Sequence, residues 1–357
     1  MDPRVDRLQR IAATRPHVIA LAGALPAREL IPRQELARAL AEVTRDGEDA
    51  LQYGWPEGSA SLRAWIANRL CARGVRITAD RVIVTAGAQQ ALAITASALG
   101  GGTVTVGDAT YPGALDAFAR AGLRAVERGG AIGYVMPGVS NPHGIAISSH
   151  GDTLIADEAY AELRFDGRTP RPLVGDDVWH IGTISKTIAP GLRVGWLVAP
   201  AAAHAAAVAA KQAMDLQSAS LSQAALARLL ATFDLDAHLA RVRACYAARA
   251  AALAEALARH APALRFREPE GGLSLWAELD DDGDELALLG AALREGVMVD
   301  PGSAFRPRPG GGLALRISFS NALPRELEEG ARRIARALSS AVVRAGSASR
   351  TRHCRDC

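Results

Sequence analysis

Two basic side chains of different chemistry lie close together near the middle of the chain. Lys186 follows an apolar, β-rich run, and a Pro-Gly turn then brings Arg193 back beside it. A lysine amine forms a Schiff base with an aldehyde, and a guanidinium matches a phosphate group. The hydroxyls of Thr183 and Ser185 add two further phosphate contacts. The segment therefore predicts a site for an aldehyde that carries a phosphate, and pyridoxal phosphate (PLP) is such a cofactor.

Lysine is rare in this sequence. Of the 41 lysines and arginines, lysine occurs only at positions 186 and 211. In a chain that uses arginine wherever a positive charge suffices, a lysine is expected where its amine is needed as a nucleophile. We assign that need to Lys186 and expect Lys211 to lie on the surface of an alanine-rich helix.

A carboxylate and a tyrosine follow the apolar run 153–156. Asp157 at the end of a strand would pair with the pyridine nitrogen of PLP and keep it protonated, and Tyr160 would hydrogen-bond the 3-oxygen of the ring. A protonated ring withdraws electrons from the α-carbon of the substrate. The segment 157–160 is also typical of a helix cap. Its assignment to PLP therefore depends on Lys186, which follows 29 residues after Asp157.

Three turns between expected strands and helices supply further ligands. Asn141 lies in a rigid Asn-Pro-x-Gly turn, where its amide would reach the 3-oxygen or a substrate carboxylate. Ala88 and Gln89 begin a helix, and free N–H groups at a helix N-terminus bind phosphate. Tyr111 offers a ring to stack on the pyridine. Taken alone, each of these signals is weak, and an ordinary turn or a core tyrosine is the more typical explanation.

The elements that must position these residues alternate from about residue 80. Helices are expected at 86–99 and 112–121, and strands at 81–85, 103–106, 132–136, 153–156, 180–184 and 194–198. Such alternation predicts a mostly parallel sheet with helices on its faces and ligands at the carboxyl ends of the strands. After Pro200, helices fill 201–260, and strands at 273–278, 297–300 and 313–319 precede a helix from 324, which indicates an α+β domain.

We therefore divide the chain into four parts. Residues 1–45 form an N-terminal segment that joins the small domain, and 46–225 form the large cofactor-binding domain. Residues 226–343 form the small C-terminal domain, and 344–357 a disordered tail.

Composition excludes several function classes. A net charge of +3 over 357 residues gives no argument for nucleic acid or for an anionic membrane. Residues 1–10 are charged and lack an apolar run, so we expect no signal peptide. The longest uncharged stretch, 194–210, is alanine-rich, so we expect no membrane span. Cysteines at 71, 245, 354 and 357 indicate reduced thiols in a cytoplasm, with no function for the Cys354/Cys357 pair and no metal site.

The order of phosphate turn, aromatic ring, Asn, Asp/Tyr, Lys and Arg resembles the aspartate-aminotransferase-like superfamily, PLP fold type I. Within it the chain is similar to class I/II aminotransferases, nearest the branch of kynurenine/2-aminoadipate aminotransferases and the aminotransferase domains of MocR regulators. Further matching segments are 21–26, 51–54, 84–90 and 315–320, and the likeness covers about 15–340. It implies a mostly parallel, seven-stranded-type α/β sheet with helices on both faces, plus a smaller α+β domain.

The resemblance implies a role for each matching residue. Lys186 resembles the Schiff-base lysine and proton shuttle, and Arg316 the arginine that clamps the substrate α-carboxylate, with Gly23 lining the mouth of the pocket. Tyr53 is similar to a tyrosine that reaches the cofactor phosphate bound in the partner subunit. This likeness implies a homodimer with shared active sites. The other cofactor ligands are implied to be Ala88, Gln89, Tyr111, Asn141, Asp157, Tyr160, Thr183, Ser185 and Arg193, and Asn141 also to bind substrate.

The predicted function is transfer of an amino group between an amino acid and a 2-oxo acid. Because this fold hosts several chemistries, a decarboxylase, lyase or cyclase is the alternative, and a non-catalytic effector-sensing domain is a further one. The sequence departs from the family in having Ala88 in place of a serine and in its short segments 127–131 and 145–151, where the family has more structure. We expect one sheet face to be less covered there.

Overall fold

The computed structural model describes residues 7, 10–11, 14–145, 152–280 and 283–352. Its larger sheet has seven strands in the order β2-β8-β7-β6-β5-β3-β4. Strand β8 is antiparallel to β2 and β7, and the other neighbours are parallel. This confirms the predicted mostly parallel α/β sheet. The strands are β2 (Val82–Thr85), β3 (Gly102–Thr105), β4 (Leu123–Val126), β5 (Ile132–Val135), β6 (Thr153–Asp157), β7 (Val178–Thr183) and β8 (Gly195–Val198).

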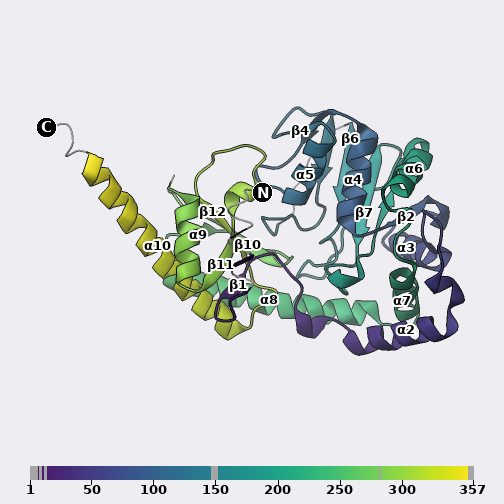
Figure 1. Cartoon of the computed structure of the whole chain (residues 1–357), viewed down its shortest axis with the longest axis horizontal. Coiled ribbons are helices and arrows are strands. Elements are labelled where there is room, and N and C mark those ends of the chain that lie inside the picture. The colour runs from purple at the N-terminus through teal and green to yellow at the C-terminus, as the bar shows by residue number, and fades with distance from the viewer. Residues whose placement is uncertain (1–6, 8–9, 12–13, 146–151, 281–282, 353–357) are drawn as a thin grey trace.

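Helices cover this sheet and link it to the rest of the chain (Figure 1). Strands β2, β5 and β8 are buried at every position, as expected for a sheet that is covered on both faces. The helices of this part are α2 (Arg33–Asp46), α3 (Ala60–Ala72), α4 (Ala88–Leu99), α5 (Pro112–Arg120), α6 (His204–Asp215), α7 (Ser220–Leu230) and the long α8 (Leu235–His260). Short 3-10 helices are η1 (Arg28–Leu30), η2 (Glu48–Leu51), η3 (Ala79–Arg81), η4 (Pro190–Leu192), η5 (Ala201–Ala203) and η6 (Gly302–Phe305).

The second sheet has five strands in the order β1-β11-β12-β10-β9. Strand β1 near the N-terminus pairs with β11 in parallel, so the first strand of the chain and the C-terminal part share one sheet. The elements are β1 (Ile19–Leu21), β9 (Arg265–Phe266), β10 (Ser274–Glu278), β11 (Val297–Pro301), β12 (Ala314–Ser318), α9 (Glu285–Arg294) and α10 (Pro324–Arg352). The exact domain boundaries stay a prediction.

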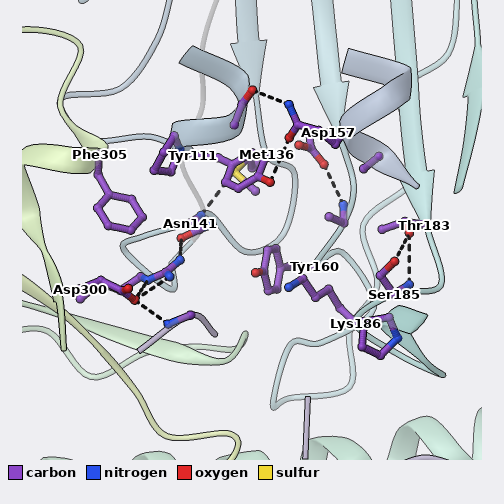
Figure 2. A pocket seen from close by; sticks show the side chains of 18 of the residues that line it. Tyr111, Met136, Asn141, Asp157, Tyr160, Thr183, Ser185, Lys186, Asp300 and Phe305 are labelled. Atoms are coloured by element: carbon purple, nitrogen blue, oxygen red, sulfur yellow. Dashed lines mark hydrogen bonds and ion pairs between the residues drawn. The ribbon is translucent and has the colours of Figure 1, made fainter. Parts of the chain in front are cut away.

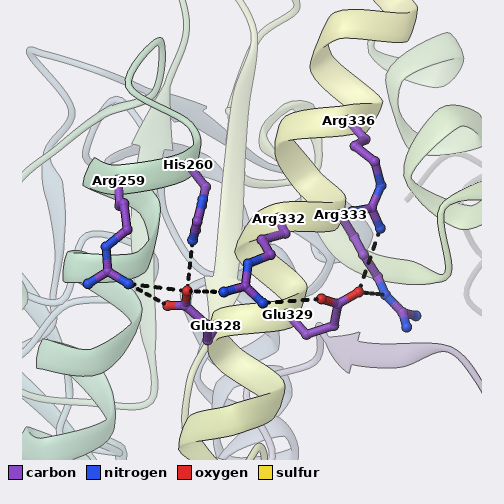
Figure 3. Close-up of polar contacts among 7 residues, drawn as sticks. All are labelled: Arg259, His260, Glu328, Glu329, Arg332, Arg333 and Arg336. Atoms are coloured by element: carbon purple, nitrogen blue, oxygen red, sulfur yellow. Dashed lines mark hydrogen bonds and ion pairs between the residues drawn. The ribbon is translucent and has the colours of Figure 1, made fainter.

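Ion pairs join the end of α8 to α10 (Figure 3). Glu328 on α10 accepts from His260 Nε2 at 2.7 Å and pairs with Arg259 at 3.2 Å, both at the end of α8. Glu329 pairs with Arg333 one turn further along α10 at 2.9 Å. Isolated exposed pairs contribute little, but several that share carboxylates hold two helices in register.

Two segments differ from expectation or are incomplete. Helix α10 continues to Arg352, where a disordered tail from 344 was expected. Extending an existing helix by one residue needs no new nucleation, and the alanines and arginines of this segment favour the extension. Cys354 and Cys357 lie outside the described residues, as does most of 145–151. Between β4 and β5 the chain crosses in residues 127–131 without a helix. No helix among the described residues is long and apolar enough to cross a membrane.

Candidate active site

One cavity of about 390 Å³ opens where the two sheets meet. It lies at the carboxyl ends of β6 and β7 and at the N-terminus of α4, and residues from β11 and β12 close it from the other side (Figure 2). Its lining includes the residues that the sequence predicted, except Tyr53: Gly23, Ala88, Gln89, Tyr111, Asn141, Asp157, Tyr160, Thr183, Ser185, Lys186, Arg193 and Arg316.

The amine of Lys186 points into this cavity from the loop that follows β7. Its Nζ donates to the carbonyl of Ala24 at 3.2 Å and lies 5.7 Å from the centre of the Tyr160 ring. Burial, followed by the positive charges of Arg316 and Arg193, lowers the pKa of Lys186 to about 8. At pH 7 about one-tenth of the amine is then uncharged and nucleophilic, far more than for an ordinary lysine.

Asp157 ends strand β6 with its carboxylate buried under the cavity. Tyr134 on β5 donates to its Oδ2 at 2.8 Å, and the N–H of Ala159 donates to its Oδ1 at 3.1 Å. Burial raises the pKa of Asp157, while the bonds from Tyr134 and Ala159 act in the opposite direction. The hydrogen bonds to this carboxylate from the described residues come from the neutral groups of Tyr134 and Ala159, so it suits a cationic nitrogen placed against it.

The opposite end of the site gathers hydrogen-bond donors. Ala88 and Gln89 begin α4, where the first N–H groups of a helix have no partner within it. Arg193, held in the left-handed region at φ 53°, donates from Nη2 to the carbonyl of Ala86 at 2.9 Å. A Cβ on Gly87 would lie 2.6 Å from this Nη2, so only glycine allows the guanidinium to approach the turn so closely.

Hydroxyl groups complete this donor-rich end. Thr183 Oγ1 donates to the carbonyl of Val194 at 2.8 Å and lies 2.9 Å from Ser185 Oγ. The bond to Val194 uses the one proton of the Thr183 hydroxyl, so Ser185 is the donor between the two hydroxyls. Both hydroxyls line the cavity, and the Ser185 hydroxyl can rotate to donate to a phosphate instead of to Thr183.

Two tyrosines border the space between these ends. Tyr111 donates to Gln89 Oε1 at 3.0 Å, and Gln89 in turn donates to the carbonyl of Gly113 at 2.8 Å. Burial raises the pKa of both Tyr111 and Tyr160 to about 12, so both hydroxyls remain protonated donors. The Gln89 side chain thus orients Tyr111, a role beyond the backbone contact predicted for it.

Arg316 reaches the cavity from β12 of the second sheet. Its Nη1 donates to Asn141 Oδ1 at 2.9 Å, and its guanidinium carbon lies 4.6 Å from the centre of the Phe305 ring. Its Nε and Nη2 donate to Oδ2 of Asp300 at 3.0 and 2.7 Å. The N–H of Gly23 donates to the same oxygen at 2.9 Å.

Tyr53 does not reach the cavity of its own chain. Its side chain belongs to a loop before α3 and is 77% exposed. The loop is tied to the end of α6 by a hydrogen bond from Gly54 N to Gln217 Oε1. The predicted role of Tyr53 in a partner subunit stays a prediction.

The prediction for Lys211 was wrong, because this lysine is fully buried. Its amine pairs with Asp215 at 2.9 Å, and Asp215 accepts from Gln90 at 2.7 Å. Gln90 in turn accepts from the N–H of Ala86 at 2.7 Å, in the turn before α4. Lys211 therefore stabilises that turn through Asp215 and Gln90. The alanine-rich sequence around Lys211 gave no sign that its amine would be buried.

Sequence reasoning also missed Tyr134, Asp300 and Phe305. Tyr134 lies inside a strand that reads as uniformly apolar, and its hydroxyl is matched to Asp157 only by the pairing of β5 with β6. Asp300 lies in the strand predicted at 297–300, which is β11 in the structure, and Phe305 ends the 3-10 helix η6 that follows it. No motif marks any of them.

The chemistry of the cavity fits PLP. An amine of lowered pKa is available for the aldehyde, and a buried carboxylate for the ring nitrogen. The helix N-terminus with Arg193 and Ser185 is available for the phosphate. Glycine at position 87 suits this arrangement, because other residues rarely adopt its φ of 83° and a side chain there would displace the Arg193 guanidinium.

Comparisons with known proteins agree with this chemistry. The family described as "Aminotransferase class I and II" matches residues 145–334. A 2-aminoadipate transaminase of Thermus thermophilus is 34% identical, with 91% of each chain covered. An uncharacterized HTH-type transcriptional regulator of Escherichia coli, YdcR, is 32% identical over 84% of this chain and 72% of that protein.

A solved structure is similar over almost the whole chain. The α-aminoadipate aminotransferase LysN of Thermus thermophilus, complexed with N-(5'-phosphopyridoxyl)-L-leucine, has a TM-score of 0.83 and 30% identity. The alignment covers 96% of this chain and 98% of that one. That protein therefore binds a phosphopyridoxyl group on the same fold.

Proposed function

The chain belongs to the aminotransferase class I and II family of PLP-dependent enzymes, and we propose that the cavity around Lys186 is where it moves an amino group between an amino acid and a 2-oxo acid. The observation that carries the proposal is the position of Lys186 and Asp157. Asp157 ends β6, Lys186 follows the neighbouring strand β7, and both side chains line one cavity. When bound, PLP supplies an aldehyde for the substrate amine and a ring that withdraws electrons.

Lys186 performs the proton transfers in this proposal. Its Nζ would hold the cofactor through the aldehyde carbon. As a free amine it would act as the base that takes a proton from the substrate Cα and as the acid that gives the proton back, and burial lowers the pKa of this amine to about 8. Asp157 would pair with the ring nitrogen and keep it protonated, and Tyr134 keeps the Asp157 carboxylate oriented.

The remaining residues bind and orient. Arg193, Ser185 and the first N–H groups of α4 hold the phosphate, and Tyr111 bounds the ring. Arg316, oriented by Asn141 at 2.9 Å, receives the substrate α-carboxylate through a guanidinium whose N–H groups form a fork. Gly23 lines the mouth of the cavity.

We further propose a cytoplasmic homodimer with shared sites. Large apolar side chains are exposed around the Tyr53 loop and the end of α6, and contact with a second copy would cover them. Free thiols at Cys71 and Cys245 support a reducing compartment. The exposed side chains are Leu51, Tyr53, Trp55, Met214 and Leu216.

The test is a half-reaction followed on the cofactor. Purified protein is mixed with a panel of L-amino acids, and the cofactor spectrum should lose its aldehyde form and regain it when a 2-oxo acid is added. Borohydride reduction of the resting enzyme, followed by peptide mapping, should place the adduct on Lys186. An adduct on the buried Lys211, or a spectrum that no amino acid changes, would contradict the proposal.

A further inference from the structure

Asp300 and Arg316 form a buried pair at the point where a substrate carboxylate is expected. They stand directly opposite each other on the antiparallel strands β11 and β12. Their side chains are 5% and 8% exposed, and Arg316 donates to Asp300 Oδ2 from both Nε and Nη2. A positive guanidinium inside the cavity is therefore already neutralised by a carboxylate of the same chain.

Most hydrogen-bonding capacity of Arg316 is in use. A guanidinium has five N–H donors. Two of them go to Asp300 and a third goes to Asn141 Oδ1. The ring of Phe305 also lies against the guanidinium at 4.6 Å. A substrate carboxylate is left with at most two donors, one on each terminal nitrogen.

Gly23, in the N-terminal segment, contributes a further hydrogen-bond donor to Asp300. Its N–H, at the mouth of the cavity, donates to Asp300 Oδ2 at 2.9 Å. Asp300 thereby collects donors from β12 and from the N-terminal segment on one oxygen. Backbone N–H and guanidinium donors that converge in a cavity form a carboxylate site, and here an internal carboxylate uses part of that site.

We propose that Asp300 is a specificity-determining residue that weakens the binding of a substrate α-carboxylate, because that carboxylate must share Arg316 with a carboxylate already in place. The proposal rests on the function proposed above, in which Arg316 receives this group. Two carboxylates beside one buried guanidinium leave an excess negative charge in a place of low dielectric, which opposes binding. A substrate with a neutral group at the same position does not meet this cost.

The opposing reading is that Asp300 only holds Arg316 in position. The two readings predict opposite signs for Asp300→Asn. Asparagine has nearly the same shape, and its carbonyl oxygen still accepts from Arg316 and Gly23, but it carries no charge. If the charge of Asp300 opposes substrate binding, the variant binds carboxylates more tightly. If the charge serves to hold Arg316, the variant binds them less tightly.

The experiment uses ligands that cannot react because they lack an amine. The cofactor-loaded enzyme is titrated by calorimetry with 4-methylpentanoate and, as the matched neutral ligand, 4-methylpentanamide. In Asp300→Asn, we expect the Kd of the carboxylate to fall by at least about fivefold, because one charge repulsion at about 4 Å amounts to about 1 kcal/mol even at the dielectric constant of bulk water. The Kd of the amide should stay within about twofold, because no charge is involved.

Asp116 supplies the control variant. It lines the same cavity but its side chain is exposed, so solvent screens its charge. Asp116→Asn should leave the Kd of both ligands within about twofold. The proposal is overturned if Asp300→Asn leaves the Kd of the carboxylate unchanged or raises it, if the amide gains equally, or if Asp116→Asn has the same effect.

Two further measurements keep the result interpretable. If Asp300→Asn does not fold or does not hold the cofactor, the wild-type enzyme provides the test. Its Kd for the carboxylate should be lower than its Kd for the amide by less than about 30-fold. A ratio of about 30-fold corresponds to about 2 kcal/mol, the contribution of one charged hydrogen bond that no other carboxylate opposes. A larger preference overturns the proposal. Arg316→Gln separates the two proposals. An unchanged Kd of the carboxylate in this variant refutes the proposal that Arg316 binds the substrate carboxylate. A raised Kd supports that proposal, and the role of Asp300 is then tested by Asp300→Asn alone.

Discussion

Tyr134 donates a hydrogen bond of 2.8 Å to the carboxylate of Asp157, and both groups are buried on the neighbouring parallel strands β5 and β6. The bond stabilises the charged form of a carboxylate whose pKa is raised by burial. Tyr134 also packs edge-on against Phe118, with ring centres 5.5 Å apart. Its hydroxyl therefore acts on the site, while its ring belongs to the core.

Tyr134→Phe should keep the fold and impair the chemistry. Removal of the hydroxyl takes away a bond that lowers the pKa of Asp157, so this pKa rises and more Asp157 is protonated at a given acidic pH. We expect the acid limb of kcat to move to higher pH by about one unit, since a hydrogen bond to a charged group contributes about 1.5–3 kcal/mol. Tyr246→Phe, which also removes a buried hydroxyl, should leave that limb in place. An unchanged profile in Tyr134→Phe would show that Tyr134 only packs.

Asp157→Asn should retain the cofactor but lose most turnover. The amide matches the carboxylate in shape, yet it cannot keep the ring nitrogen protonated, so the electron-withdrawing capacity of the cofactor falls. We expect kcat to fall by roughly 100-fold or more, as for the loss of a general electrostatic contribution of about 3 kcal/mol. Absorbance of the bound cofactor measures retention, and steady-state assays measure kcat. Near-normal turnover would refute the role of Asp157.

The pKa of Lys186 predicts how cofactor uptake depends on pH. Because burial and two arginines lower this pKa to about 8, the amine is protonated below that pH and cannot attack the aldehyde. The rate of PLP incorporation into cofactor-free enzyme should therefore rise with pH, with a single-proton midpoint near 8, and level off above it. Stopped-flow absorbance measures this rate. A midpoint close to the ordinary lysine value would show that the amine is not buried in the functional protein.

Arg316→Lys should raise the KM for amino acids while cofactor binding stays intact. A lysine ammonium supplies a point charge but not the planar fork that meets both carboxylate oxygens. Loss of that geometry removes about 1.5–3 kcal/mol, or roughly 10- to 100-fold in KM. The matched control is Arg164→Lys, because Arg164 makes its ion pairs with Asp166 and Glu270 on the protein surface. If KM is unchanged in Arg316→Lys, the substrate carboxylate is held elsewhere.

Mixed dimers test the proposed role of Tyr53. Chains inactivated by Lys186→Ala are combined with chains inactivated at Tyr53 by a substitution severe enough to release the cofactor. Some activity should return, because one site of a mixed dimer receives its lysine and its tyrosine from different intact chains. Tyr53→Phe by itself should weaken PLP binding by about 0.5–3 kcal/mol for one lost hydrogen bond. A monomer by light scattering, or no rescue after proven subunit exchange, would rule out a shared site.

The sequence alone determined the parts of this protein that depend on local pattern. Short β-rich runs ending in polar residues place Asp157, Thr183 and Lys186 at strand ends, and carboxyl ends of parallel strands meet at one edge of a sheet. A glycine before a helix places the N–H groups of Ala88 and Gln89 there for the same local reason. The fold class and these ligands follow from such short-range rules.

Only the tertiary structure decided which side chains pair across distant segments. Tyr134 meets Asp157 through strand pairing, Lys211 is buried beneath the turn before α4, and Asp300 faces Arg316 through the register of β11 with β12. Gly23 joins the last pair from 277 residues away. Periodicity indicates whether a position faces inward, but the partner that its side chain meets there depends on packing between elements. The ion pair of Arg316 with Asp300 could therefore be found only in three dimensions.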